Sequence, residues 1–161
     1  MAKKDTKVVA TTEISSEVVK DASFYFAVGR RKTAVARARV YPSSAEVSVG
    51  GKKLEKGETY VNGMPIEQYF KSPYAKAQYS ELFRTTNTAG RFIITVVVNG
   101  SGESGQLGAT TLAIARSLVQ VDPKFRAILR KKDYMTRDPR GKERKKAGLP
   151  GARKKKSSPK R

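Results

Sequence analysis

The sequence predicts a single α+β domain that carries a long basic tail. Its 161 residues suit one hydrophobic core with flexible ends better than two separately packed domains. Strand-like segments come first, and helical stripes and one further apolar strand follow. Near Tyr134 the composition changes and large apolar residues nearly cease. We therefore expect a mobile N-terminal arm at residues 1–22, an α+β domain at 23–134 and an extended basic tail at 135–161.

Two strands joined by a basic turn begin the domain. FYFAV and AVARARVY are strand-like, and GRRKT between them is typical of a basic glycine turn. Period-two alternation in the second strand predicts a packed face with Ala34, Ala36, Ala38 and Val40. The opposite face carries Val35, Arg37, Arg39 and Tyr41. Further strand-like segments around 47–49 and 59–61, separated by a Gly- and Lys-rich loop at 50–57, predict an antiparallel region.

A helix and a central strand follow. Ser72 is a candidate N-cap and Pro73 suits the first helical position. The helix should lie over the sheet, with one side formed by Ala75, Tyr79, Leu82 and Phe83. Residues 91–98 are apolar at both alternating faces, which predicts a strand buried on both sides.

Two more helices complete the domain. From about Ser104, one helical stripe contains Leu107, Thr111, Ile114, Leu118 and Val121. Arg116 and Gln120 should point the opposite way. The pair Asp122-Pro123 should end this helix and cap another, whose buried side carries Phe125, Ile128 and Leu129.

The net charge indicates a polyanionic partner. Lysine and arginine total 34 against 14 acids, a formal charge of +20. A chain this basic repels itself unless negative charge lies beside it, so nucleic acid is the leading partner class. Residues 137–161 alone hold 12 basic and 2 acidic side chains, a net charge of +10.

The residue types exclude most catalytic and metal chemistry. Cysteine and histidine are both absent, which removes zinc clusters, disulfides, thiol nucleophiles and histidine acid–base catalysis. No carboxylate pair stands out as an acid and a base, and no Walker loop is present. We therefore expect no catalytic residue, no metal and no cofactor.

The sequence favours a soluble, cytoplasmic protein. The longest apolar run, at 92–98, is strand-sized and far short of the ~20 residues that cross a bilayer. The first 22 residues balance four lysines against four acids and contain no apolar signal core. Neither a secretory signal nor an arginine-rich transit peptide fits, so a membrane partner is not expected.

One glycine string admits two interpretations. Gly100, Gly102 and Gly105 form G-x-G-x-x-G between a strand and a helix, as in a dinucleotide-binding fingerprint. Asp122, however, precedes Pro123 and a further helix, so a complete βαβ unit is missing. Two roles of these glycines remain possible: they bind a phosphate group at the helix N-terminus, or they only form a tight turn between strand and helix.

Two basic segments are candidate phosphate contacts. Arg30, Arg31 and Lys32 in the turn, continued by Arg37 and Arg39, form a contiguous cationic surface in sequence. The tail can stretch roughly 80 Å, and Gly148, Pro150 and Gly151 prevent one continuous helix. An irregular path through folded RNA suits it better than insertion as a helix into a DNA groove.

Four separated motifs resemble one family. GRRKTAVARARV, VNGMPIEQYF, GSGESGQLGA and TRDPRGKERKKAGLPGARKKK occur in the order found in the S-nine family of small-subunit ribosomal proteins, over residues 24–161. The arm at 1–22 lies outside the resemblance, and the loop at 50–57 looks like an insertion. At the tip, Ser157-Ser158-Pro159 stands where the family usually has an aromatic residue followed by serine.

The resemblance implies a fold and a location. The fold would be that of the second domain of ribosomal protein S-five, a mixed sheet covered by helices with a left-handed crossover. The location would be the head of the small ribosomal subunit, with ribosomal RNA, neighbouring head proteins and the peptidyl-site tRNA as partners. An organellar ribosome is the less favoured setting.

The resemblance also implies site residues. Contacts to ribosomal RNA would involve Arg30, Arg31, Lys32, Arg37, Arg39, Gly102, Gly105, Gln106, Arg137, Arg140, Arg144, Lys145, Lys146, Arg153 and Lys154. Lys160 and Arg161 would approach the tRNA backbone. The alternative function is a histone-like protein that compacts nucleic acid, which explains the charge but not the four motifs. An enzyme that uses the glycine string is the third reading.

Overall fold

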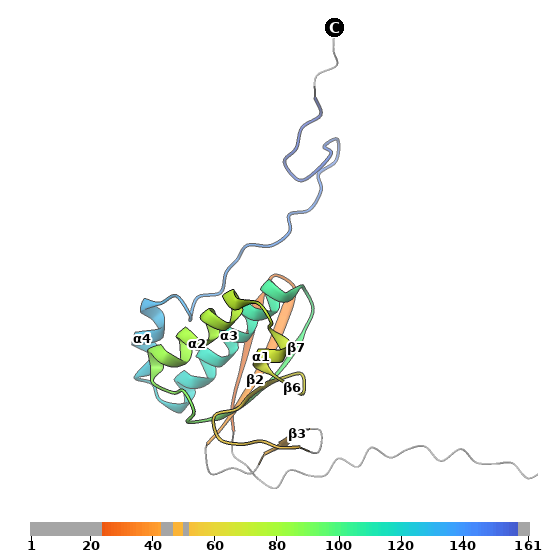
Figure 1. Ribbon diagram of the computed structural model, residues 1–161. Helices are drawn as coiled ribbons and strands as arrows, with labels where there is room; N and C mark the ends of the chain where they lie inside the picture. The colour runs from red at the N-terminus through yellow and green to blue at the C-terminus, as the bar shows by residue number, and fades with distance from the viewer. Residues whose placement is uncertain (1–23, 43–46, 50–51, 158–161) are drawn as a thin grey trace, which may run out of the picture.

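A computed structural model describes residues 24–42, 47–49 and 52–157. The expected arm at residues 1–22 lies outside these described residues. In chain order the elements are β1 (Tyr25–Arg31), β2 (Ala34–Tyr41), β3 (Ser48–Val49), β4 (Lys52–Lys53), β5 (Thr59–Val61), β6 (Met64–Pro65), α1 (Ile66–Tyr69), α2 (Pro73–Thr86), β7 (Ile93–Asn99), α3 (Glu103–Val121) and α4 (Phe125–Lys131) (Figure 1).

Five strands form one mixed sheet in the order β1-β2-β7-β5-β6. Neighbours β1, β2 and β7 are antiparallel, β5 runs parallel to β7, and β6 turns back antiparallel to β5. Strands β3 and β4 form a separate antiparallel pair. The α+β class and the antiparallel region predicted from the sequence are therefore confirmed.

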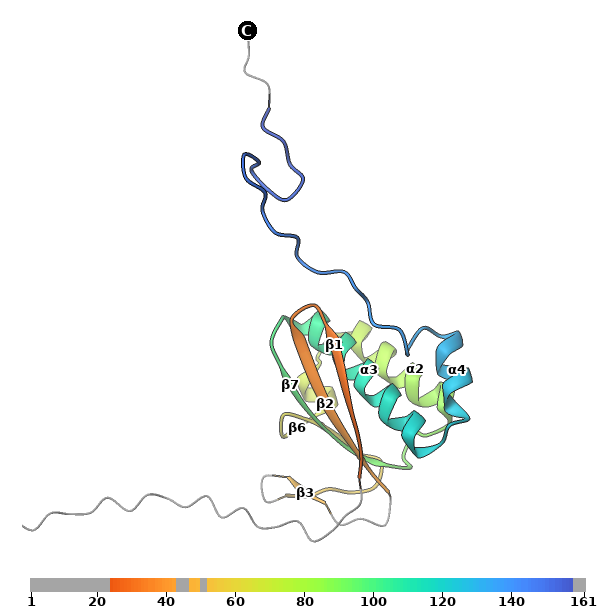
Figure 2. The same cartoon turned by 180° about the vertical axis from the view of Figure 1, so that it is seen from behind.

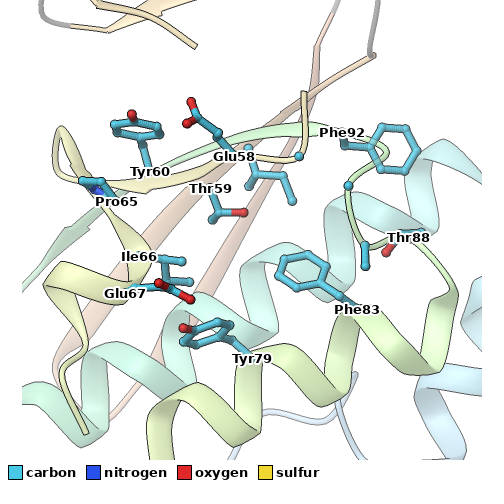
Figure 3. A pocket seen from close by; sticks show the side chains of 14 residues that line it. Glu58, Thr59, Tyr60, Pro65, Ile66, Glu67, Tyr79, Phe83, Thr88 and Phe92 are labelled. Atoms are coloured by element: carbon cyan, nitrogen blue, oxygen red, sulfur yellow. The ribbon is translucent and has the colours of Figure 1, made fainter. Parts of the chain in front are cut away.

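The sheet is covered on one side only. Figure 2 shows β1 and β2 with α2, α3 and α4 all to one side of them. No described helix covers the opposite surface, where Val97 keeps 52% of its area exposed. We call this surface the open face. By strand register it carries Phe26, Val28, Arg30, Val35, Arg37, Arg39, Thr95, Val97 and Asn99.

Small residues let α3 lie close against the covered face. Ala34, Ala36 and Ala38 point inward from β2 and are fully buried, as the alternation predicted. On β1, a methyl group added at Gly29 would lie only 2.0 Å from the carbonyl oxygen of Ala109 in α3. Glycine at this position therefore permits direct helix–strand contact.

The predicted helices form, with two corrections to their faces. Leu107, Ile114 and Leu118 are buried in α3 as expected, and Gln120 is exposed. The prediction that Arg116 points away is wrong, because the side chain is half-buried and Nη1 donates a hydrogen bond to the Val28 carbonyl oxygen at 2.8 Å. Arginine stems cover apolar surface readily, so a helical stripe does not identify every packed position.

The second correction concerns Ile128 in α4, which was expected on the buried side of the helix. Leu129 is fully buried and Phe125 packs against the core, but Ile128 keeps 42% of its area exposed. The helix has only seven residues, so its contact with the domain is narrow and one apolar side chain is left outside it. Helix α2 begins at Pro73 as expected, although the Ser72 side chain makes no cap hydrogen bond.

The strands differ from expectation at three places. Gly29 and the two arginines after it belong to β1, so the turn is reduced to Lys32 and Thr33, with Lys32 at a positive φ of 51°. Strand β7 is central but not buried on both sides, because Val97 faces the open surface. Part of the expected loop at 50–57 pairs as strand β4.

Tyr41 on β2 is a fourth departure, because it is buried rather than on an exposed cationic face. It forms a small cluster with Val47, Leu54 and Ile93. The end of the β2–β7 ladder is therefore closed by apolar contacts, and the open face narrows to the part of the sheet nearer the β1–β2 turn.

Residues 132–157 contain no helix or strand and lead away from the domain (Figures 1 and 2). Tyr134 and Met135 pack against the core before the chain departs. Among the described residues, no helix is both long enough and apolar enough to span a bilayer.

Candidate nucleic-acid interface

The open face places exposed arginines beside apolar side chains. Cross-strand register aligns Phe26 with Arg39 and Val28 with Arg37, and Arg37 is aligned in turn with Val97. Neighbouring strands lie about 4.8 Å apart, so side chains of one row are in reach of each other. Both arginines are exposed, and Phe26 keeps 42% of its area exposed. The surface thus offers guanidinium groups for phosphates and apolar faces for bases.

Aromatic contacts hold the end of this surface. The guanidinium carbon of Arg39 lies 5.2 Å from the ring centre of Phe24, a cation–π distance. The Phe24 ring lies 5.6 Å from that of Tyr41, which is buried. Phe24 and Tyr41 therefore limit the freedom of Arg39 and leave its charge at the surface.

The cationic line continues toward the β1–β2 turn. Arg30 is exposed on the open face and lies opposite Val35, and Lys32 projects from the turn itself. None of Arg30, Lys32, Arg37 and Arg39 forms an ion pair within the described part of the chain. These four charges are consequently free to meet phosphate groups.

Arg31 does not share this surface. It alternates to the covered face, where Nη2 lies 3.3 Å from Oδ2 of Asp138. Nη1 donates a long hydrogen bond of 3.5 Å to the carbonyl oxygen of Ser104. The expectation of one contiguous surface through Arg30, Arg31 and Lys32 is therefore wrong in its geometry, because adjacent strand residues point to opposite faces.

The glycine string forms the turn into α3. Gly100 has a φ of 80° and Gly102 is the N-cap, with open space where its Cβ would be. Gly105 is buried against Ser101. Glu103 puts a carboxylate into the first helical turn, which opposes the binding of a phosphate at that end.

Gln106 has a structural role in this region. Its Oε1 accepts a hydrogen bond of 2.8 Å from the Tyr69 hydroxyl, and its Nε2 donates one of 3.2 Å to the Gly100 carbonyl oxygen. In the described residues after α3, the chain forms α4 and adds no further strand to the sheet. The order of elements thus lacks the second parallel strand of a dinucleotide-binding unit.

The tail divides its charges between paired and free groups. Arg140 binds Asp138 through Nε at 3.0 Å and Nη2 at 2.9 Å, and Arg153 binds Glu143 through Nη2 at 2.6 Å. Of the predicted RNA contacts in the tail, Arg137, Arg144, Lys145, Lys146 and Lys154 are exposed and form no ion pair in the described part of the chain, and the same holds for Lys142, Lys155 and Lys156. Lys160 and Arg161 lie outside the described residues.

Hydrogen bonds perturb one carboxyl group at the tail's base. Side-chain and backbone hydrogen bonds from Arg140, supported by the charge of Arg31, hold the pKa of Asp138 well below its usual range. Asp138 is therefore ionised throughout the neutral and mildly acidic range, and it neutralises part of the positive charge around it.

The apolar part of the surface was missed by sequence reasoning. Phe24, Phe26 and Val97 are exposed, and no motif marks them. The alternation of residues in β1 could have predicted that Phe26 lies on the open face, since Phe26, Val28 and Arg30 follow each other at intervals of two residues. The exposure of one face of β7 could not be recognised from the sequence, because a strand that is buried on both faces has the same kind of apolar run.

The sequence is similar to those of known ribosomal proteins. A family model described as ribosomal protein S9/S16 matches residues 29–161. "Small ribosomal subunit protein uS9" of Thermotoga petrophila is 46% identical over 129 residues, which cover 80% of this chain and 90% of that protein. The protein of the same name from Maridesulfovibrio salexigens is 40% identical over 130 residues, covering 81% and 91%.

The family model covers the β1–β2 turn, the helices and the tail, and the relatives at 40–46% identity cover about four fifths of the chain. The enzyme interpretation of the glycine string is therefore rejected. The family is one of structural, non-enzymatic ribosomal proteins, in agreement with the prediction that the chain is not an enzyme. A family model over residues 29–161 and relatives at 40–46% identity show that the chain belongs to the ribosomal protein S9/S16 family.

Proposed function

We propose that this chain is a structural constituent of the small ribosomal subunit that binds ribosomal RNA through its open face and its tail. The observation that carries the proposal is the row of exposed, unpaired arginines at Arg37 and Arg39, flanked by Phe26 and Val97. An uncovered sheet with arginines and an aromatic ring is a surface that suits RNA, because bases stack on it and phosphates pair with it.

The site residues take different parts in this binding. Arg30, Lys32, Arg37 and Arg39 would contact phosphates from the domain. Gly102, Gly105 and Gln106 would shape the turn that lies near the RNA. From the tail the contacts would come from Arg137, Arg140, Arg144, Lys145, Lys146, Arg153 and Lys154, while Arg31 would act at the junction of domain and tail.

The tail's tip is assigned to tRNA on the family resemblance. Lys160 and Arg161 would approach the backbone of the peptidyl-site tRNA, with the subunit head, its neighbouring proteins and the cytoplasm as the setting. The resemblance likewise implies the fold of the second domain of ribosomal protein S-five, and the crossover from β5 through α1 and α2 to the parallel strand β7 would then be left-handed. Charge density in the tail supports the assignment, since a segment without a hydrophobic core gains order only against a polyanion.

Salt-dependent binding tests the RNA proposal. For about eight neutralised phosphates, the slope of log affinity against log salt should be about −6 on small-subunit ribosomal RNA. The variant R37Q/R39Q should lower the steepness of this slope by about 1.4 and weaken binding. The matched control R126Q/R130Q removes two exposed arginines from α4, away from the open face, and should change binding much less.

Two results would overturn this assignment. One is a slope near zero. The other is equal retention of the chain on duplex DNA and on ribosomal RNA in competition at physiological salt, which would favour a DNA-compacting protein. Silence in calorimetric titration with a dinucleotide is expected, because in the described residues no parallel strand follows the glycine turn and α3.

A further inference from the structure

The tail is fastened to the domain at one charged contact. After Tyr134 and Met135 pack on the core, Asp138 is the last described residue that forms an ion pair with the domain. Hydrogen bonds and ion pairs of the described residues beyond it, such as Arg153 with Glu143, stay within the tail. The direction of the departing chain in Figure 1 is therefore set at or before Asp138.

The partner of Asp138 is itself fixed on the domain. Arg31 leaves the end of β1 on the covered side and lies across α3 at Gly108. A Cβ added at Gly108 would lie 2.3 Å from Cδ and 2.7 Å from Nη1 of Arg31. The helix thus has a glycine where the arginine crosses it, and the Ser104 carbonyl oxygen accepts from the guanidinium beyond.

Both members of this pair are only about a quarter exposed. The side chains of Arg31 and Asp138 keep 24% and 25% of their area. Partial burial reduces solvent screening relative to an exposed surface pair. Asp138 is also held on its other side, because Oδ1 accepts hydrogen bonds from the backbone N–H and from Nε of Arg140, both at 3.0 Å.

We propose that Asp138 is a positioning residue that binds Arg31 and thereby fixes the direction in which the tail leaves the domain. Residues 139–161 hold almost no apolar side chain, so they cannot dock by hydrophobic burial. Fixing their base restricts the volume that the tip explores and raises its effective concentration at one target. The consequence for tRNA rests on the proposed function, whereas the contact itself concerns the free chain.

A substitution at Gly108 can break the contact between Arg31 and Asp138 without destabilising the fold. Alanine there collides only with the end of a flexible arginine, and alanine favours helix over glycine by about 1 kcal/mol. The variant G108A should therefore keep or raise the melting temperature while it displaces Arg31 from Asp138. D138N removes the charge and retains an oxygen that accepts the Arg140 backbone N–H, so the local turn is preserved.

The test is a distance measurement on the full chain in solution. Spin labels are attached at Gln120→Cys in α3 and at Lys142→Cys in the tail. The sequence has no cysteine of its own, so no other position is labelled. We expect a single narrow distance distribution in this background and a clearly broadened one after D138N or G108A. The matched control E143Q breaks the ion pair with Arg153, inside the tail, and should leave the distribution narrow.

A distribution that stays narrow in D138N and G108A, or one that is already broad before either change, would overturn the proposal. Double-mutant analysis adds a second criterion, since D138N should have no further effect once R31M is present. Retention of peptidyl-site tRNA by small subunits gives the functional readout. If tail truncation leaves tRNA retention unchanged while D138N still broadens the distances, the tRNA assignment fails and the positioning contact stands.

Discussion

The side-chain amide of Asn62 forms two hydrogen bonds with the backbone of Val98. Oδ1 of Asn62 accepts from the Val98 N–H at 2.8 Å, and Nδ2 donates to the Val98 carbonyl oxygen at 2.9 Å. The amide thus takes the place of a peptide group and continues the β5–β7 ladder past the end of β5 at Val61. Asn62 also has a positive φ of 49°, which asparagine tolerates better than most residues.

Replacing Asn62 by alanine should destabilise the fold. N62A leaves both Val98 groups without their partner and keeps a Cβ in the left-handed region, so we expect a loss of about 2 kcal/mol in the free energy of unfolding. Urea denaturation measures this loss. The neighbouring variant M64A, at an exposed side chain of β6, provides the comparison, and a smaller effect of N62A than of M64A would refute the role assigned to the amide.

Gly29→Ala should be one of the most damaging single methyl additions in the chain. The new Cβ would meet backbone atoms of α3, Ala109 O at 2.0 Å and Ala113 N at 2.5 Å, which cannot yield as a flexible side chain does. We expect a loss of about 3 kcal/mol or more by thermal or urea unfolding. Gly102→Ala meets no atom within 4 Å and serves as the control. Equal stability of the two variants would contradict the close approach of helix and strand.

Phe26→Ala should separate binding from stability. The ring is exposed on the open face, so its removal should change the free energy of unfolding by only a few tenths of a kcal/mol. If a base stacks on the ring, affinity for ribosomal RNA should fall by about 1–3 kcal/mol. Ile128→Ala, an equally exposed apolar side chain on α4, should leave affinity unchanged. A similar effect of the two variants on RNA binding would argue against stacking.

The contact between Asp138 and Arg31 should survive mild acid. Hydrogen bonds from Arg140 lower the pKa of Asp138 from its ordinary value of 3.8. A lowered folded-state pKa contributes stability that is complete above about pH 4 to 5 and is lost as the pH falls through the folded value. The spin-label distances should therefore be the same at pH 7 and pH 5. Broadening between those two values would show that Asp138 is not held as described.

Removal of the last four residues should leave the domain intact. Deleting residues 158–161 takes away two basic side chains and none of the described residues that form the core. Calorimetry should give an unchanged melting temperature, whereas filter binding should show weaker retention of peptidyl-site tRNA. Unfolding of the domain on truncation would mean that the end of the tail has a packing role.

Periodicity predicted the strands and helices better than it predicted their surroundings. The inward alanines of β2 and the buried leucines of α3 follow directly from spacing, and both are found. Spacing does not say how many layers a fold has, so β7 was expected to be covered on both sides and is open at Val97. The same limitation explains why Arg116 was expected to point away from the sheet, because its packing partners in β1 are distant in sequence.

The candidate site was predicted in its charge but not in its arrangement. Arg37 and Arg39 follow from alternation within one strand. The position of Arg31 could not be predicted in this way, because it depends on how the tail packs beside the end of β1. Its partner Asp138 is more than a hundred residues away in sequence. The hairpin at Asn62-Gly63 was within reach of sequence reasoning, because this dipeptide is typical of two-residue turns, here with φ values of 49° and 81°.

Cosedimentation with small ribosomal subunits tests the central claim most directly. The full chain, R37Q/R39Q and the control R126Q/R130Q would each be added to subunits that lack this component and run on a sucrose gradient at physiological salt. We predict that the full chain and the control migrate with the subunit and that R37Q/R39Q is largely lost from it. Equal comigration of R37Q/R39Q, or failure of the full chain to comigrate, would contradict RNA binding through the open face.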